Sequence, residues 1–470
     1  MNETSDKKSG VIGTILIYLL FGLFFIFQVQ GTYDGDQMAL YLVLLGAYFW
    51  IAGLLVIAKV RHGLYIFEPL FFIALLYLGI YIYKPIIDLK TNSFYEHGIY
   101  VRDGGIKATL LIVLSFTVFY VSYYSRHPRI VLGKRSYTNS DDGNNSVPVS
   151  SQTVVFLYIA WGIVFALSIV SMLSQGLNLR YIFSLGSSGT RVNEGNTALL
   201  FLSNFAITSI SLWLLIMLHS KNSIGKIAIT VLEIIYLLTR NGRWLILVIA
   251  LAPVVYYYVK RKRSPRIGFV VVGGLILLTV FAWMQANRYG ILTGSGYSGW
   301  GSQGFSLQVL TSPFESDFNT YRLFYSMVMR YPALYPYMLG TTFAYIFILF
   351  IPRALWATKP NNPVLDIIEH SLNSNARQAG TAISNVGEIY ANFGIIGCVI
   401  GMYILGWVAS RVKELCYSED ENTLAMYAII YPLLFQWTAR GMFSSNVFTT
   451  IFAILPFFIV RRKTNRRYAS

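Results

Sequence analysis

Apolar stretches of about 20 residues recur along the whole chain, and this repetition constrains the fold more than any other feature. A helix needs about 20 apolar residues to cross a bilayer, so most of these stretches can form a span. Hydrophobic residues make up 55% of the 470 residues and charged residues only 12%, about half the charged share of a soluble globular protein. This composition excludes a soluble enzyme, a disordered chain and a disulfide scaffold. We expect an all-α polytopic integral membrane protein with about twelve transmembrane helices, at roughly 11–29, 38–58, 64–83, 108–125, 153–174, 197–218, 227–239, 244–259, 267–285, 384–409, 424–439 and 445–460.

The basic residues predict how the chain is oriented. The net charge of +16 would suggest nucleic-acid binding in a soluble protein, but membrane proteins concentrate Lys and Arg in cytoplasmic loops. When the spans alternate across the membrane, 22 of the 37 Lys and Arg residues fall on one side. The clusters at 260–266 and 461–467 identify that side as the cytoplasm. We therefore expect both termini inside, an even number of spans and no nucleic-acid partner.

One long segment, residues 286–383, is expected on the outer side. Residues 334–352 within it are apolar enough to cross, but a crossing there would place the C-terminal basic cluster outside. We therefore predict a re-entrant or surface-lying helix, which must be buried in protein or line a cavity where it enters the membrane. The expected organisation is nine spans in residues 1–285, the periplasmic segment 286–383, and three spans with a basic cytoplasmic tail in residues 384–470.

The other 15 basic residues lie on or near the outer side, and eleven of them are arginines. Because guanidinium groups form paired hydrogen bonds with phosphate, this excess indicates an anion site. The two shortest apolar stretches flank Arg240 and Arg243, which would share one face of a helix at the tip of a hairpin. A charge held near hydrocarbon is costly and indicates a function. Headgroup contacts, salt bridges and snorkelling arginines at a plain interfacial turn are the alternatives.

Two motifs follow in the last third of the chain. The sequence GEIYANFGIIG at 387–397 places Glu388 near the outer end of a span. This acid would serve as a general base toward a sugar hydroxyl or pair with an outer arginine. The sequence PRALWATKP at 352–360 places Arg353 and Lys359 beside Trp356. This arrangement suits a sugar phosphate at a membrane surface, and an interfacial tryptophan anchor is the alternative.

No pattern for metal or nucleophilic chemistry is present. The five histidines are scattered without ligand spacing, and Cys398 and Cys416 lie in or just beyond an apolar stretch. The sequence GSGYSG at 294–299 matches the dinucleotide-binding pattern, but no strand precedes it. We expect no metal site and no cofactor.

Taken together, these motifs resemble the Wzy-type O-antigen and capsule repeat-unit polymerases. The resemblance rests on the TRNGR sequence at 239–243, the long outer segment, and the motifs at 352–360 and 387–397, and it is strongest over residues 235–410. It implies glycosyl transfer at the outer face of a bacterial inner membrane. The donor would be a growing glycan on undecaprenyl pyrophosphate, and the acceptor one lipid-linked repeat unit. Related O-antigen ligases and C-type glycosyltransferases imply that no metal is needed.

The resemblance also implies roles for individual residues. Arginines would stabilise the negative charge that develops on the leaving pyrophosphate. The first candidates are Arg240, Arg243, Arg353 and Arg377, with Arg353 close to the chemistry and Glu388 as the base. The second group comprises Arg288, Arg322 and Arg440. Aromatic faces suit sugar rings, and the sugar-binding candidates are Trp356, Tyr390 and Tyr321.

The expected partners are the undecaprenyl-pyrophosphate-linked oligosaccharide and membrane lipid, together with a chain-length regulator protein and a flippase. Three other functions fit parts of the sequence. An O-antigen ligase would share the topology and the outer arginines. A flippase or transporter would need internal repeats, which are not detected. A scaffold subunit would not need clustered arginines on the outer side.

Overall fold

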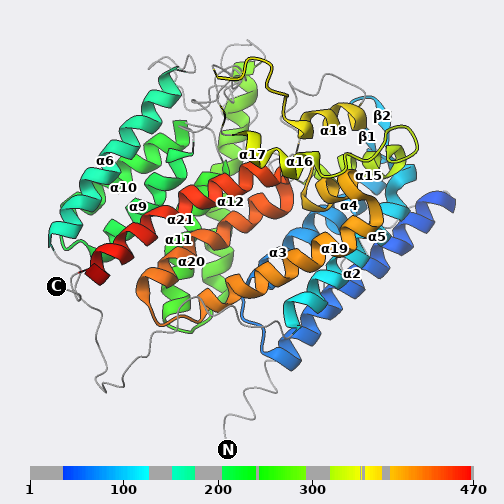
Figure 1. Ribbon diagram of the computed structural model, residues 1–470. Helices are drawn as coiled ribbons and strands as arrows, with labels where there is room; N and C mark the ends of the chain where they lie inside the picture. Colours follow the sequence, from blue (N-terminus) through cyan, green and yellow to red (C-terminus); the bar gives the residue numbers. More distant parts are fainter. Residues whose placement is uncertain are drawn as a thin grey trace, which may run out of the picture.

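The computed structural model describes residues 35–125, 151–174, 204–239, 243–292, 318–349, 351, 355–372 and 382–466. Almost all of the regular structure in these ranges is helical (Figure 1), so the expected all-α class is confirmed. The long helices are α2 (Gly35–His62), α5 (Gly105–Tyr124), α6 (Ser151–Ser174), α9 (Phe205–His219), α10 (Ser223–Thr239), α11 (Arg243–Lys260), α12 (Ile267–Leu292), α19 (Asn385–Cys416), α20 (Glu421–Phe435) and α21 (Phe443–Arg466). Two further helices, α3 (Pro69–Leu78) and α4 (Lys84–Thr91), are joined by a π-helical turn at Gly79–Tyr83.

Seven helical segments in the described ranges are long and apolar enough to cross a membrane. The predicted stretch 11–29 lies outside these ranges, and each of the other predicted stretches overlaps a helix. The count of twelve spans and the side of each terminus stay predictions. Many side chains on the outer faces of the helices are apolar and exposed, as lipid-facing residues are, and those on α19 include Ile395, Ile396, Ile400 and Ile404.

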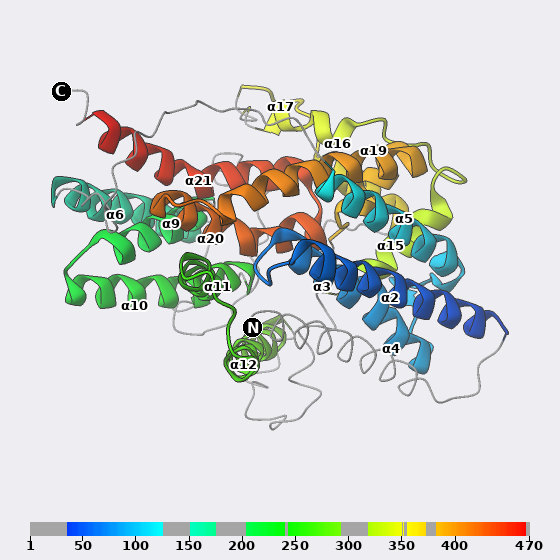
Figure 2. The same cartoon turned by 90° about the horizontal axis from the view of Figure 1, so that it is seen from below.

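Close helix packing forms the centre of the molecule. Helix α5 lies along α19, α11 lies along α20, and α9 contacts both α6 and α21. Gly406 permits the first of these approaches, because a Cβ there would lie 2.5 Å from the Phe119 carbonyl oxygen. Ser122 Oγ then donates to the Tyr403 carbonyl at 2.6 Å. Helix α12 lies at the edge of the bundle beside α11 (Figure 2).

The helices begin and end at two polar ends of the bundle. At one, which we call the Glu68 end, Lys413 pairs with Glu68 at 3.1 Å and Lys260 pairs with Glu421. At the other, the Glu388 end, α19 and α21 begin side by side, because the Phe443 N–H donates to Glu388 Oε2 at 2.8 Å. The last residue of α11, Lys260, pairs with the first residue of α20, Glu421, so the two packed helices are antiparallel. Helix α11 therefore begins at the Glu388 end, where α20 finishes.

The described part of residues 286–383, the segment predicted to lie outside and called the outer segment below, gathers at the Glu388 end (Figure 1). It consists of α15 (Thr320–Arg330), α16 (Thr341–Ala344), α17 (Ile346–Leu349) and α18 (Pro363–Leu372), next to a hairpin of β1 (Tyr95–Glu96) and β2 (Ile99–Tyr100). Residues 334–349 therefore form two four-residue helices and no helix of spanning length. Both short helices pack against α21. The predicted re-entrant or surface-lying position of this stretch stays a prediction.

Candidate functional site

The buried carboxylate of Glu388 lies where α19 and α21 begin. The Ser384 side chain caps α19 by accepting from the Gly387 N–H at 3.2 Å. One turn later Glu388 is only 2% exposed. Its Oε2 accepts from Phe443 N–H, and a negative charge is favoured at a helix N-terminus. The Thr342 hydroxyl lies near this carboxyl, but Oε1 meets no hydrogen-bonding geometry with any described residue.

The turn that leads from α20 into α21, where Phe443 donates its N–H to this carboxylate, also carries Arg440. Helix α20 ends in a π-helical turn, Gln436–Arg440, and the chain reverses at Gly441 with φ 65° and ψ −143°. The Arg440 carbonyl accepts from the Ile383 N–H at 3.2 Å, and Asn446 Nδ2 donates to the Gln436 carbonyl at 3.2 Å. The backbone of the turn is therefore fixed from both sides. The Arg440 guanidinium is half-buried and has no hydrogen-bond or ion-pair partner within the described part of the chain.

The outer segment packs against α19 at the motif 387–397, and hydrogen bonds hold the two together. Gly394 breaks the helix with φ 65° and ψ −151°, a conformation that glycine adopts most readily. The carbonyls of Ala391 and Asn392 accept instead from the N–H groups of Met338 and Leu339, at 3.0 and 3.1 Å.

The side chain of Asn392 completes this junction. Its Oδ1 accepts from the Gly340 N–H at 3.0 Å, and its Nδ2 donates to Thr342 Oγ1 at 2.8 Å. The same Nδ2 donates to the Glu388 carbonyl at 2.7 Å. Glu388, Asn392 and Gly394 of the motif thus all contribute to the contact between α19 and residues 338–342.

Tyr390 ties the outer segment to the same part of α19. It is buried, and its hydroxyl donates to the Tyr331 carbonyl at 3.0 Å. The Tyr331 hydroxyl in turn forms a hydrogen bond with His370 Nδ1 at 2.9 Å, and the Tyr335 ring stacks on His370 with centroids 4.1 Å apart. Tyr390, predicted to bind sugar, contacts protein groups here, and its sugar-binding role stays a prediction.

The motif at 352–360 is described only in part. Lys359 is buried and donates to the carbonyls of Leu349 and Ile351, both at 2.9 Å, so it caps the end of α17. Trp356 is exposed, and its Nε1 donates to Thr358 Oγ1 at 3.1 Å. Arg353 lies outside the described residues.

Of the other predicted arginines, the structure describes the side chain of Arg243 but not those of Arg240, Arg288 and Arg377. Arg243 is the first residue of α11 and is half-buried. Because α11 lies along α20, Arg243 and the Arg440 turn are at neighbouring helix ends. Arg240 and Arg377 lie outside the described residues. Arg288 belongs to α12, but its side chain is not among those described.

Arg322 belongs to an ion cluster that the sequence did not reveal. Asp88 in α4 accepts from Arg322 Nη2 at 2.6 Å and from Lys84 Nζ at 2.7 Å. Tyr321, another predicted sugar-binding residue, is buried and donates its hydroxyl to the same carboxylate. Burial and the Asp88 charge raise the pKa of Tyr321 well above its usual range. Asp88 and Lys84 stand one helical turn apart, which was the available signal, but their partner is more than 200 residues away.

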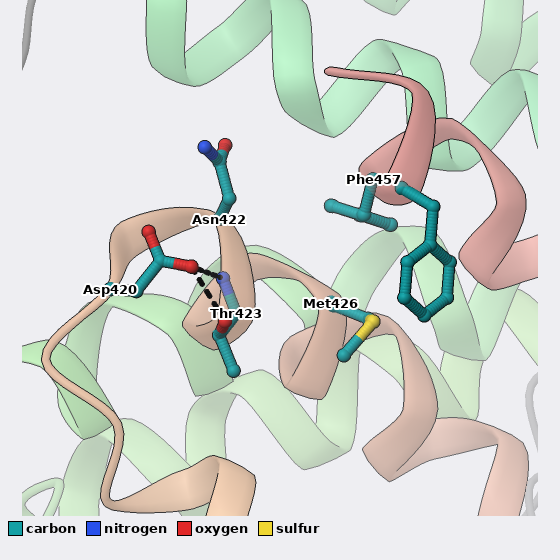
Figure 3. Close-up of a pocket in the computed structure, with 6 residues that line it drawn as sticks. Asp420, Asn422, Thr423, Met426 and Phe457 are labelled. Atoms are coloured by element: carbon teal, nitrogen blue, oxygen red, sulfur yellow. Dashed lines mark hydrogen bonds between the residues drawn. The ribbon is translucent and has the colours of Figure 1, made fainter. Parts of the chain in front are cut away.

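The Glu68 end has a recess of a different kind (Figure 3). It is lined by Asp420, Asn422, Thr423, Met426, Phe457 and Phe458. The Asp420 carboxylate accepts from the Thr423 N–H at 3.1 Å and from its hydroxyl at 2.6 Å, which caps α20. The acidic side chain in this recess, Asp420, therefore serves as a helix cap. Across the described ranges, no three His, Cys, Asp or Glu side chains converge as metal ligands would.

Comparisons with known proteins now bear on the whole chain. Searches of curated proteins and of solved structures found no match. A family model for the O-antigen polysaccharide polymerase Wzy, in contrast, matches residues 12–467. The match covers nearly the full length, including the Glu388 junction, the Arg440 turn and the outer segment. The chain therefore belongs to the Wzy family of O-antigen polysaccharide polymerases, which are membrane proteins of polysaccharide biosynthesis.

Proposed function

We propose that this protein polymerises oligosaccharide repeat units carried on undecaprenyl pyrophosphate, at the periplasmic face of a bacterial inner membrane and without a metal ion. The observation that carries the proposal is the Glu388 end itself. There, Glu388 is buried where α19 and α21 begin, and one of its carboxylate oxygens meets no partner in the described ranges. The turn that leads into α21 carries Arg440, whose side chain likewise has no partner in those ranges. Family membership supports the choice of substrate class.

The arginines are proposed to bind pyrophosphate. Lipid pyrophosphates place their charge where the polar head meets hydrocarbon, at the depth where a spanning helix ends. Arg243 begins α11 and Arg440 ends the π-helical turn after α20, which supports this role, and helix N-termini favour anions. Arg240, Arg353 and Arg377 are proposed to complete this set, with Arg288 in reserve. Arg322 is less suited, because Asp88 already holds it.

Glu388 is proposed as the general base. The acceptor hydroxyl would lose its proton to Oε1 while its oxygen forms a bond to the anomeric carbon of the donor. The bond from that carbon to the pyrophosphate oxygen would break, and the pyrophosphate would leave with the electron pair. The hydrogen bond from Phe443 would keep Oε2 fixed throughout.

The outer segment is proposed to hold the sugars. Trp356 is exposed at the Glu388 end and offers a flat face and an N–H group. Tyr321 and Tyr390 are buried, so their proposed contribution is to hold the outer segment in place through Asp88 and the Tyr331 carbonyl. A chain-length regulator protein and a flippase are proposed as working partners of the enzyme.

Gene deletion followed by a gel of surface glycans tests the proposal. We expect one repeat unit on the lipid core and no ladder, with the ladder restored by the wild-type gene. Polymer retained on the lipid carrier would identify a ligase, and failure of any repeat unit to reach the outer face would identify a flippase. Either outcome would overturn the proposal.

Thiol labelling of intact cells tests the orientation. Leu339→Cys places an exposed thiol at the Glu388 end, and Glu419→Cys places one at the Glu68 end. The two native cysteines are buried. We expect a membrane-impermeant reagent to label position 339 and not position 419, and the reverse pattern would contradict a periplasmic site.

A further inference from the structure

The β1–β2 hairpin at the Glu388 end presents an aromatic surface that the proposed chemistry does not use. Tyr95 and Tyr100 are directly paired across the two strands, so their side chains lie on the same face. Their ring centroids are 5.1 Å apart. The Arg102 guanidinium lies over the Tyr100 ring at 5.3 Å from its centroid. Two rings and a cation thus form a continuous row.

Tyr95 is 60% exposed, and lipid does not explain this exposure. The hairpin is not part of an apolar helix face, because it follows the polar end of α4 and precedes the helical turn Arg102–Gly104. Its neighbours His97 and Asp103 are exposed and polar. A large aromatic side chain exposed among polar groups suits a ligand that has both an apolar face and hydroxyl groups.

The hairpin is held rigidly, as a binding surface needs to be. Arg322 Nη1 donates to the Tyr95 carbonyl at 3.2 Å and lies 3.7 Å from Glu96 Oε2. The same guanidinium is bonded to Asp88. Phe94 is fully buried, and its carbonyl accepts from the Val101 N–H at 2.9 Å. The ion cluster around Asp88 therefore fixes the hairpin to α4 and α15.

We propose that Tyr95, Tyr100 and Arg102 form a subsite for the carbohydrate of the growing chain, away from the bond being made. A pyranose ring would stack on Tyr95, and Arg102 would hydrogen-bond to hydroxyl or carboxylate groups of the neighbouring sugar. This inference rests on the proposed function. It assigns the hairpin to retention of the polymer between successive additions, so loss of the subsite shortens chains without preventing the first linkage.

Two measurements test the subsite. The first uses purified full-length protein in detergent and polysaccharide released from its lipid by mild acid, so no membrane or pyrophosphate contributes. Tyr95→Ala removes one stacking face and should weaken binding about 2- to 10-fold. Tyr95→Trp should retain binding. Unchanged affinity in Tyr95→Ala would overturn the proposal.

The second measurement is the chain-length distribution in the deletion strain. Tyr95→Ala should give a ladder shifted to shorter chains, with two-repeat products still abundant. The matched control is Tyr257→Ala, because Tyr257 is 46% exposed and lies under Arg261 at 4.2 Å, at the Glu68 end. A wild-type ladder in Tyr95→Ala, or an equal shift in the control, would overturn the subsite. Absence of a ladder with the wild-type gene would instead refute the polymerase function, and the binding measurement would still decide the subsite.

Discussion

The two ends of the bundle each bury a glutamate, and the two glutamates are bonded in opposite ways. Glu68 is 1% exposed and fully engaged: its carboxylate accepts from the Tyr123 hydroxyl at 2.9 Å and the Tyr417 hydroxyl at 2.6 Å, and pairs with Lys413. Glu388 is equally buried but accepts one backbone hydrogen bond, and its second oxygen has no partner among the described residues.

This difference supports a structural role for Glu68 and the proposed functional role of Glu388. Buried polar groups in folded proteins are nearly always satisfied, so an unsatisfied one indicates function. The neighbouring arginines follow the same division. Arg322 is used by Asp88 and the hairpin, whereas the Arg440 side chain meets no partner in the described ranges. Burial alone would not distinguish these groups.

Replacing Glu388 should have the largest effect on activity. Glu388→Gln keeps an oxygen for the Phe443 N–H but removes the base, so polymer formation should fall about 10²- to 10⁴-fold while thermal stability changes little. Rates would be measured on purified protein with lipid-linked repeat units. The matched control is Glu233→Gln, since Glu233 is buried but held by Ser209 and Trp161. Normal polymerisation by Glu388→Gln would leave Glu388 a structural role only.

Arg440→Ala should have the second-largest effect on activity. Removal of one preorganised group that stabilises developing negative charge lowers enzyme rates about 10²- to 10³-fold, and we expect a similar loss here. Because Arg440 has no side-chain partner in the described ranges, the folded state should be preserved, as a thermal-shift measurement can verify. Arg322→Ala should show the opposite pattern, with lost stability and a smaller change in rate per folded molecule. Wild-type activity in Arg440→Ala would contradict the proposed role of Arg440 and its difference from Arg322.

Gly394→Ala should have an intermediate effect, acting through the junction. An alanine Cβ would lie 2.7 Å from the Tyr337 ring, in a backbone conformation that side chains rarely adopt. Strain of about 1–3 kcal/mol should loosen residues 337–342, and proteolysis there should accelerate while polymerisation falls about tenfold. Gly273→Ala in α12 meets open space and should behave as wild type. Equal protease resistance in both variants would show that the junction is not held by the kink.

Glu68→Gln should have the smallest effect on activity. Lys413 would lose its buried partner, and breaking such a pair costs about 3–5 kcal/mol, so the melting temperature should fall. The rate per folded molecule at low temperature should stay at the wild-type value. Glu421→Gln removes an ion pair from a more exposed site and should change stability by less than about 1 kcal/mol. A large loss of rate per folded molecule in Glu68→Gln would show that the Glu68 end also contributes to activity.

The helices were predictable because each follows from a local run of apolar residues. The motif around Glu388 could also be located from the sequence. Its structural role could not be predicted, since Ala391 and Asn392 bind residues 338–342 through hydrogen bonds between segments that are about 50 residues apart in the sequence. Arg322 and Arg440 looked alike in the sequence, and only their long-range partners separate them. The hairpin tyrosines carried no signal, because two-residue strands leave too short a pattern to detect.

One measurement tests the central claim most directly: purified protein in liposomes supplied only with the lipid-pyrophosphate-linked repeat unit, in the presence of EDTA. We expect a ladder of lipid-linked polymer from the wild type and no ladder from Glu388→Gln or Arg440→Ala. A wild-type protein that forms no polymer, or that transfers glycan only when a lipid A–core acceptor is added, would contradict it.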